Sequence, residues 1–280
     1  METTFQPGPN RYAFADPRPG PKREIAVHVY RPAFFGPYTP IVLVLAGRKR
    51  NASAYLDYWK MDSEQRGFLV VAPEFTESQY PHPYEYGLGA MRGAEGEIRP
   101  REEWLFPVIE AIFRDVRARA GSMRERYVLF GHSAGAQLVH RLVTFGWSAS
   151  IERAIAANSG SYAMPVRTED VPFGLGGLPY TDADVHALLS RPMFVHLGDQ
   201  DNDPNDEHLP REPAAMRQGS HRFARGLRYM ETASRVAGRL GVPLAWRLVI
   251  AQGVAHSGQR MVPLAARELF DSTTHSTALR

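Results

Sequence analysis

The stretch YVLFGHSAGAQLVH, residues 127–140, decides how this chain is expected to fold. Its first four residues form an apolar run typical of a strand that is buried on both faces. The apolar residues after Gly135 recur at the spacing of the inner face of a helix. Between strand and helix, the glycines predict a tight turn with Ser133 at its apex. A serine in this context is typical of the Gly-x-Ser-x-Gly nucleophile elbow.

The glycines of this turn have a chemical reason. A serine hydroxyl attacks a carbonyl only if it projects into open space, beside a base and facing donors for the new oxyanion. Gly131 and Gly135 lack side chains that would collide with the neighbouring strand and helix. The backbone N–H of Ala134 lies at a helix N-terminus, which favours negative charge, so we expect it to be an oxyanion donor. The alternative is a chance match in a glycine-rich connection, but the flanking strand and helix favour the elbow.

Strand and helix patterns alternate along the rest of the chain. We expect strands at 24–30 (as an edge strand), 41–45, 68–72, 127–130, 151–156, 193–197 and 245–250, and helices at 54–66, 104–120, 222–240 and about 262–269. This order predicts an α/β protein with the α/β-hydrolase fold: a mostly parallel sheet, helices on both faces and a small cap or lid region. In such sheets ligands bind beyond the carboxyl ends of the strands.

Two polar segments follow expected strands and complete a candidate catalytic triad. GDQDND (198–203) comes after the strand at 193–197, and QGVAHS (252–257) after the strand at 245–250. With Ser133 they give the chain order nucleophile, acid, histidine, which is the order of α/β-hydrolases. His256 is expected to take the proton of Ser133 and return it to the leaving group. The other histidines fall inside strands, on helices, in loops or, like His275, in the C-terminal tail.

Three aspartates, Asp199, Asp201 and Asp203, compete for the role of the acid. We expect Asp201, because a Gly-x-x-Asp turn places its carboxylate beyond the strand end, where it can accept the second ring N–H of His256. The alternative is that DQDNDPND (199–206) binds calcium. Proline stands at 204 and 210, however, where an EF-hand loop needs glycine and glutamate. We therefore expect no metal and no cofactor.

The loop after the strand at 41–45 is expected to supply the second oxyanion donor, the N–H of Arg48. The cationic side chains of Arg48 and Lys49 either lie at the surface or, turned inward, favour an anionic or strongly polar acyl group. Two aromatic and proline-rich segments, 79–87 and 164–180, are expected to line the pocket as loops rather than only to pack. The residues expected to contact substrate are Gly47, His132, Tyr84, Tyr86 and Phe173.

Composition narrows the class of protein. The 280 residues include 24 Gly, 22 Pro and no cysteine, so disulfides, thiol nucleophiles and thiolate zinc sites are excluded. No linker-like run divides the chain, which predicts a single domain over 1–280 with a possible lid at about 163–185. A net charge of +3 with dispersed basic residues argues against nucleic acid as a partner. The N-terminal stretch is not expected to be a signal peptide, no apolar run is long enough for a membrane span, and we expect a cytoplasmic monomer or homodimer.

These motifs together resemble the α/β-hydrolase superfamily serine esterases related to polyhydroxybutyrate depolymerases and feruloyl esterases. The resemblance runs from about 40 to 270 and is carried by LAG (45–47), RNA (50–52) with Tyr55, VAPEF (71–75), GHSAG (131–135) and GVAH (253–256). The chain departs from these relatives at Ala46, where they usually carry histidine; the backbone donor is expected to remain.

We expect a cofactor-free enzyme that cleaves carboxylic esters through a covalent acyl-enzyme. Its substrate is expected to be a small-molecule or polyester-type ester. Hydrolysis of amides or carbamates, and acyl transfer, are alternatives that use the same triad. A catalytically silent scaffold that binds a small molecule is the alternative outside the enzymes. Such scaffolds often lose a triad member, whereas this chain has kept all three.

Overall fold

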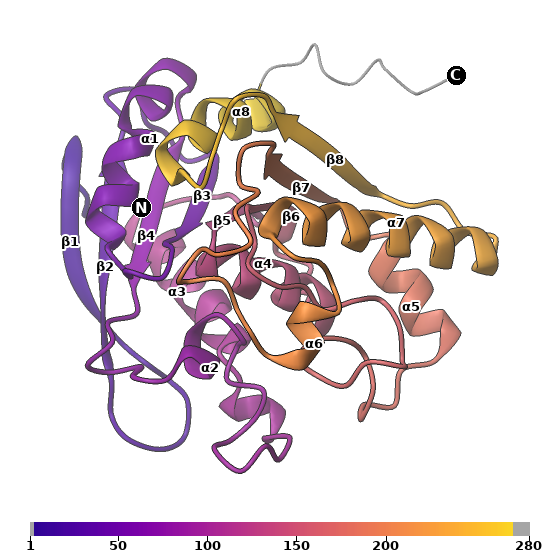
Figure 1. Cartoon of the computed structure of the whole chain (residues 1–280). Coiled ribbons are helices and arrows are strands. Elements are labelled where there is room, and N and C mark those ends of the chain that lie inside the picture. Colours follow the sequence, from indigo (N-terminus) through magenta and orange to yellow (C-terminus); the bar gives the residue numbers. More distant parts are fainter. Residues whose placement is uncertain (1–2, 271–280) are drawn as a thin grey trace.

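A computed structural model describes residues 3–270, so His275 lies outside the described part. One eight-stranded sheet runs through the molecule in the order β1-β2-β4-β3-β5-β6-β7-β8 (Figure 1). The strands are β1 (Gly8–Ala15), β2 (Glu24–Arg31), β3 (Ile41–Leu45), β4 (Leu69–Glu74), β5 (Tyr127–His132), β6 (Ile151–Ala157), β7 (Met193–Gly198) and β8 (Trp246–Ala251). The helices are α1 (Ala52–Arg66), α2 (Pro83–Tyr86), α3 (Phe106–Arg119), α4 (Ala134–Phe145), α5 (Asp182–Leu189), α6 (Pro213–Met216), α7 (Arg222–Leu240) and α8 (Gly258–Phe270), with a 3₁₀ turn η1 (Arg101–Glu103).

The sheet is mostly parallel, as expected for the α/β-hydrolase fold. β1 and β2 pair antiparallel, as do β2 and β4, and the remaining pairs are parallel. All residues of β3, β5 and β7 are buried, which explains why these strands are short uninterrupted apolar runs. Because β3, β5, β6, β7 and β8 run parallel, their carboxyl ends meet at one edge of the sheet. The candidate site residues follow at that edge.

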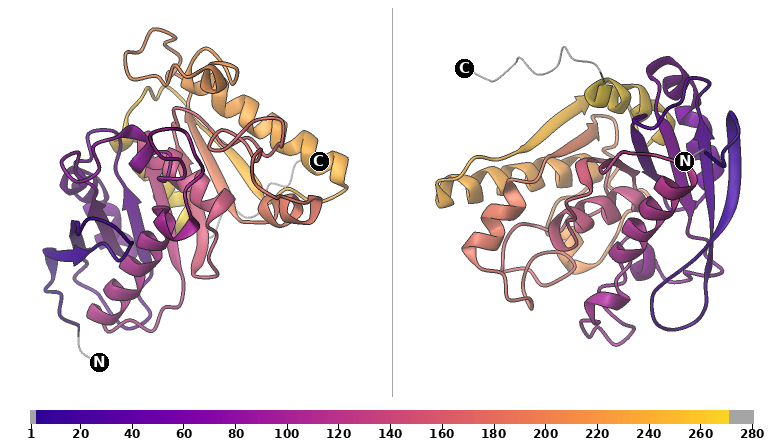
Figure 2. Two further views of the ribbon diagram at one scale, coloured as in Figure 1. Left: turned by 90° about the horizontal axis from the view of Figure 1, so that it is seen from below. Right: turned by 180° about the vertical axis from the view of Figure 1, so that it is seen from behind.

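Two layers of helices cover the sheet (Figures 1 and 2). α1 and α8 pack on one face, over a core that includes Trp59, Phe130 and Met261. α3, α4, α5 and α7 cover the other face, over a larger core that includes Leu129, Leu142 and Tyr229. Within residues 3–270, no helix combines the length and the apolar character needed to cross a membrane.

Several expectations about the elements were wrong at particular places. β2 is not an edge strand, because β1, which was not expected, pairs with it along eight residue pairs. Segment 79–87 does contain a short helix, α2. Its N-terminus has proline in the first turn and a capping box in which the Glu85 side chain accepts from the backbone N–H of His82. α5 and α6 were also missed.

Candidate active site

Ser133 lies in the turn between β5 and α4, with a strained backbone. Its φ of 56° and ψ of −116° are unusual for a residue with a side chain. Gly131 and Gly135 make the turn possible: a Cβ on Gly131 would lie 2.4 Å from the Gly135 carbonyl oxygen, and one on Gly135 would lie 2.1 Å from the Leu45 oxygen. Ser133 N–H donates to the Ala157 carbonyl at 2.9 Å. The surroundings therefore hold the Ser133 side chain outward.

Three side chains from three strand ends meet in one hydrogen-bonded chain. Ser133 Oγ lies 2.9 Å from His256 Nε2, and His256 Nδ1 lies 2.7 Å from Asp201 Oδ2. The Asp201 side chain is 5 % exposed, whereas that of His256 is 27 % exposed. A buried carboxylate that accepts Nδ1–H leaves Nε2 as the acceptor for the serine proton. The three residues are those that sequence reasoning selected.

The neighbouring aspartates have other partners. Asp199 Oδ1 accepts the backbone N–H of Gly253 at 2.8 Å, which holds the turn that leads to His256. Asp203 Oδ1 accepts the backbone N–H of Asn205 at 2.8 Å within its own loop. The carboxylates of DQDNDPND therefore do not converge on one point. Across residues 3–270 there is no group of three or more His, Cys, Asp and Glu side chains that could hold a metal ion.

Arg222 joins the acid end of this chain and was missed from the sequence. Its side chain is 3 % exposed; Nη1 lies 3.4 Å from Asp201 Oδ1 and Nη2 lies 2.8 Å from Asp206 Oδ1. The hydrogen bond from Arg222 lowers the pKa of Asp206 to about 2. An arginine at the start of a helix usually faces solvent, so no sequence pattern indicated this contact. Here the guanidinium lies beside two carboxylates and favours the ionised form of Asp206.

His132 lies beneath the site and is held by Tyr55. Tyr55 Oη is 2.7 Å from His132 Nδ1, and the rings of His132 and His256 are 4.7 Å apart between centroids. Burial lowers the pKa of His132 well below its ordinary value, and the charges of His256 and Arg222 act in the same direction. Burial likewise raises the pKa of the Tyr55 hydroxyl. His132 is therefore neutral, and Tyr55 donates to it.

The two expected oxyanion donors border the same space. Ala134 begins α4, and the first N–H groups of a helix have no partner within the helix. Gly47 lies close to the serine on the opposite side, since a Cβ on it would be 3.5 Å from Ser133 Cβ and 2.9 Å from Tyr55 Oη. Tyr86 Oη donates to the Ala46 carbonyl at 2.7 Å and so fixes the loop that carries Arg48. Gly47, Arg48 and Ala134 all line the cavity.

The cavity around Ser133 has a volume of about 760 Å³, and its lining combines apolar and polar groups with both signs of charge. The charges come from Arg48, Lys49, Arg50, Arg222, Glu77, Glu207 and Glu212. Of the residues expected to contact substrate, Gly47, His132 and Tyr86 line this cavity.

Tyr84 and Phe173 are corrections to that expectation, because neither lines the cavity. The Tyr84 ring stacks on His82 at 4.9 Å, and the guanidinium of Arg141 lies 5.6 Å from the Phe173 ring. Segment 164–180 folds onto itself through bonds such as Met164 N–H to the Phe173 carbonyl at 2.8 Å. Its aromatic and proline content therefore serves packing. Only the residues just before it, Gly160 and Ser161, reach the cavity.

No family model matches the chain, and no curated protein matches it. Several solved structures match the chain. Poly(aspartic acid) hydrolase-1 from Sphingomonas sp. KT-1 is 37% identical with a TM-score of 0.88, over 94% of this chain and 98% of that one. LpqC, a poly(3-hydroxybutyrate) depolymerase from Bordetella parapertussis, is 35% identical with a TM-score of 0.87, over 95% of this chain and 91% of that one. FphF, a fluorophosphonate-binding serine hydrolase of Staphylococcus aureus, shares the fold at 14% identity, with a TM-score of 0.57 over 94% of this chain and 98% of that one. Identity above one third along nearly the whole chain shows that this protein belongs to the α/β-hydrolase serine esterases related to polyhydroxybutyrate depolymerase.

Proposed function

We propose that this protein hydrolyses carboxylic esters through an acyl-enzyme formed on Ser133. The observation that carries the proposal is the hydrogen-bonded chain from Ser133 through His256 to Asp201, which opens into a cavity of about 760 Å³. The cavity is open enough for a small ester or for one end of a polyester chain.

In the first half-reaction, Ser133 Oγ forms a bond to the ester carbonyl carbon while its proton passes to His256 Nε2. The tetrahedral intermediate carries its negative charge on the former carbonyl oxygen, which the N–H groups of Ala134 and Arg48 bind. The C–O bond to the alcohol then breaks, and the protonated His256 returns the proton to the leaving alkoxide. Water, deprotonated by His256, releases the acid from Ser133 in the same way. Asp201 keeps Nδ1–H oriented throughout and stabilises the imidazolium.

Hydrolysis of amides is the second candidate, and one observation favours it. The relative that is 37% identical is named as a hydrolase of poly(aspartic acid), a polyamide with carboxylate side chains. The exposed Arg48 and Lys49 beside the cavity would attract such a substrate. The same triad would serve, with an amine in place of the alcohol as leaving group.

A fluorophosphonate probe tests the proposal directly, because it labels only an activated serine. We expect stoichiometric labelling of the wild type and none of Ser133→Ala, together with a loss of roughly 10⁴-fold or more in kcat for p-nitrophenyl esters. The rates of hydrolysis of esters with increasing acyl length, a polyester and an aspartate oligomer then show whether the enzyme prefers ester or amide bonds. Wild-type protein that binds these compounds without labelling or turnover would instead be a silent scaffold.

A further inference from the structure

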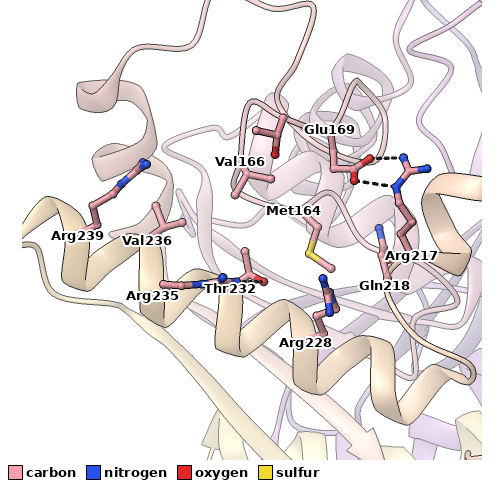
Figure 3. A pocket seen from close by; sticks show the side chains of 11 residues that line it. Met164, Val166, Glu169, Arg217, Gln218, Arg228, Thr232, Arg235, Val236 and Arg239 are labelled. Carbon is pink, nitrogen blue, oxygen red and sulfur yellow. Dashed lines mark hydrogen bonds and ion pairs between the residues drawn. The ribbon is translucent and has the colours of Figure 1, made fainter.

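A second hollow lies between α7 and the segment that follows β6, and four of its eleven lining residues are arginines (Figure 3). Its volume is about 380 Å³, and it shares no lining residue with the cavity at Ser133. Arg228, Arg235 and Arg239 reach it from α7, and Arg217 reaches it from the segment before α7. Glu169 is the one acidic residue in the lining. The hollow therefore carries a clear excess of positive charge.

The three arginines of α7 stand in one row. Their spacing of seven and four residues corresponds to nearly whole helical turns, so they project from the same side of the helix. At 1.5 Å per residue the row is about 16 Å long along the helix axis. A single small ion would span only part of it, whereas an elongated anion would meet all three.

The three guanidinium groups of α7 form no close ion pair in the described part of the chain, although the charge of Glu169 also acts on Arg228. Among residues 3–270, Glu169 pairs with Arg217, at 2.6 Å, and no carboxylate lies within ion-pair distance of the three arginines of α7. Glu231 precedes Arg235 by four residues, a spacing that ordinarily forms an ion pair on a helix. Arg235 instead donates to Thr232 Oγ1 at 3.3 Å, toward the hollow.

The hollow also has an apolar side. Met164 and Val166 form its wall opposite the helix, and Val236 contributes from α7 itself (Figure 3). Gln218 fixes this wall, because its buried side chain accepts Tyr162 N–H at 2.8 Å and donates to the Tyr162 carbonyl at 2.7 Å. Inorganic ions make no use of apolar contacts. A row of guanidinium groups facing methyl groups fits an organic chain that carries acidic groups.

We propose that this hollow is a binding site for an elongated organic anion with two or more carboxylate groups joined by an apolar chain. Guanidinium groups bind carboxylates through paired N–H donors, and the apolar chain would cover Met164 and Val166. The site is separate from Ser133 and does not depend on the proposed reaction.

Calorimetric titration of the whole protein with three probes tests the proposal. Heptanedioate carries two carboxylates on an apolar chain, heptanoate carries one, and pyrophosphate carries charge without an apolar part. We expect heptanedioate to bind at least tenfold more tightly than heptanoate, and more tightly than pyrophosphate. Tighter binding of pyrophosphate would make the hollow a phosphate site and overturn the proposal, as would equal binding of heptanoate.

Variants then locate the binding. The double variant Arg235→Gln with Arg239→Gln should weaken heptanedioate about tenfold or more, because each guanidinium supplies a charge-assisted hydrogen bond. Arg11→Gln with Arg114→Gln removes the same charge from exposed positions outside the hollow and should leave binding unchanged. All four side chains are exposed, so both proteins should fold, which thermal melting checks. Equal weakening in the two double variants would show nonspecific charge attraction and overturn the site.

Discussion

At the scale of single residues, the different roles of Asp199, Asp201 and Asp203 can be measured. Asp201→Asn should lower kcat by about 10⁴-fold, because an amide beside His256 Nδ1 favours the wrong ring tautomer. Asp199→Asn should cost less than tenfold, since an amide oxygen can still accept Gly253 N–H. Asp203→Asn is a second control in the same loop. Steady-state kinetics on a p-nitrophenyl ester measures kcat for each variant. A severe loss of kcat in either control would show that Asp201 is not the acid of the triad.

Arg222 is expected to act by positioning the acid. Arg222→Met should lower kcat/KM by roughly ten- to a hundredfold. The reason is that Asp201 would lose the guanidinium contact that helps to hold its carboxylate beside His256 Nδ1. Arg211→Met is the matched control, because exposed Arg211 donates to the Pro204 carbonyl at 2.8 Å in the same loop but contacts neither carboxylate. An equal fall in kcat/KM for Arg211→Met would show that the loss comes from disturbing the loop and not from the contact of Arg222 with Asp201.

At the scale of elements, the nucleophile elbow depends on close backbone approach. Gly135→Ala should destabilise the fold by several kcal/mol, because the new Cβ would lie 2.1 Å from the Leu45 carbonyl and α4 would have to move away from β3. Gly238→Ala is the control in another helix: nothing lies within 4 Å of its Cβ, so it should stabilise by about 0.5–1 kcal/mol. Urea unfolding measures both. Similar free energies of unfolding for the two variants would show that a Cβ at position 135 is not crowded by the Leu45 carbonyl.

The elements that sequence predicted well are those with a purely local signature. β3 is a short apolar run between turn residues, and the bounds expected for α7 agree with the structure because its amphipathic pattern is long. β1 has no such signature: GPNRYAFA holds glycine and proline, and pairing with β2 makes it a strand.

The same limit applies to the site. Ser133, Asp201 and His256 meet because each follows a parallel strand, which sequence order indicates. The contact of Arg222 with Asp201 depends on how α7 packs against the sheet, and no local sequence pattern predicts that packing. The prediction that Phe173 contacts substrate was wrong for the same reason. A loop that folds onto itself and a loop that reaches the cavity have similar composition.

At the scale of the whole molecule, three buried histidines couple stability to pH. Burial lowers the pKa of His196 to about 3 and the pKa values of His132 and His140 well below their ordinary range. The folded protein thus keeps these rings neutral, whereas the unfolded chain protonates them below about pH 6.5. Their contribution is complete above that pH and is lost as the pH falls. Each ring lowers the free energy of unfolding by up to roughly 1.4 kcal/mol per pH unit.

Urea unfolding at several values between pH 6.5 and 4.5 would measure this slope. His196→Leu should reduce it by about 1.4 kcal/mol per pH unit, because the variant removes one ring that must stay neutral inside the sheet. Neither ring nitrogen of His196 has a hydrogen-bond partner in the described part of the chain. The substitution by leucine therefore removes no hydrogen bond, and the change in slope reports the ring alone. His186→Asn, on the exposed side of α5, should leave the slope as it is. If His196→Leu leaves the slope unchanged, water or a proton reaches the His196 ring in the folded protein, and the core around β7 is less closed than its packing implies.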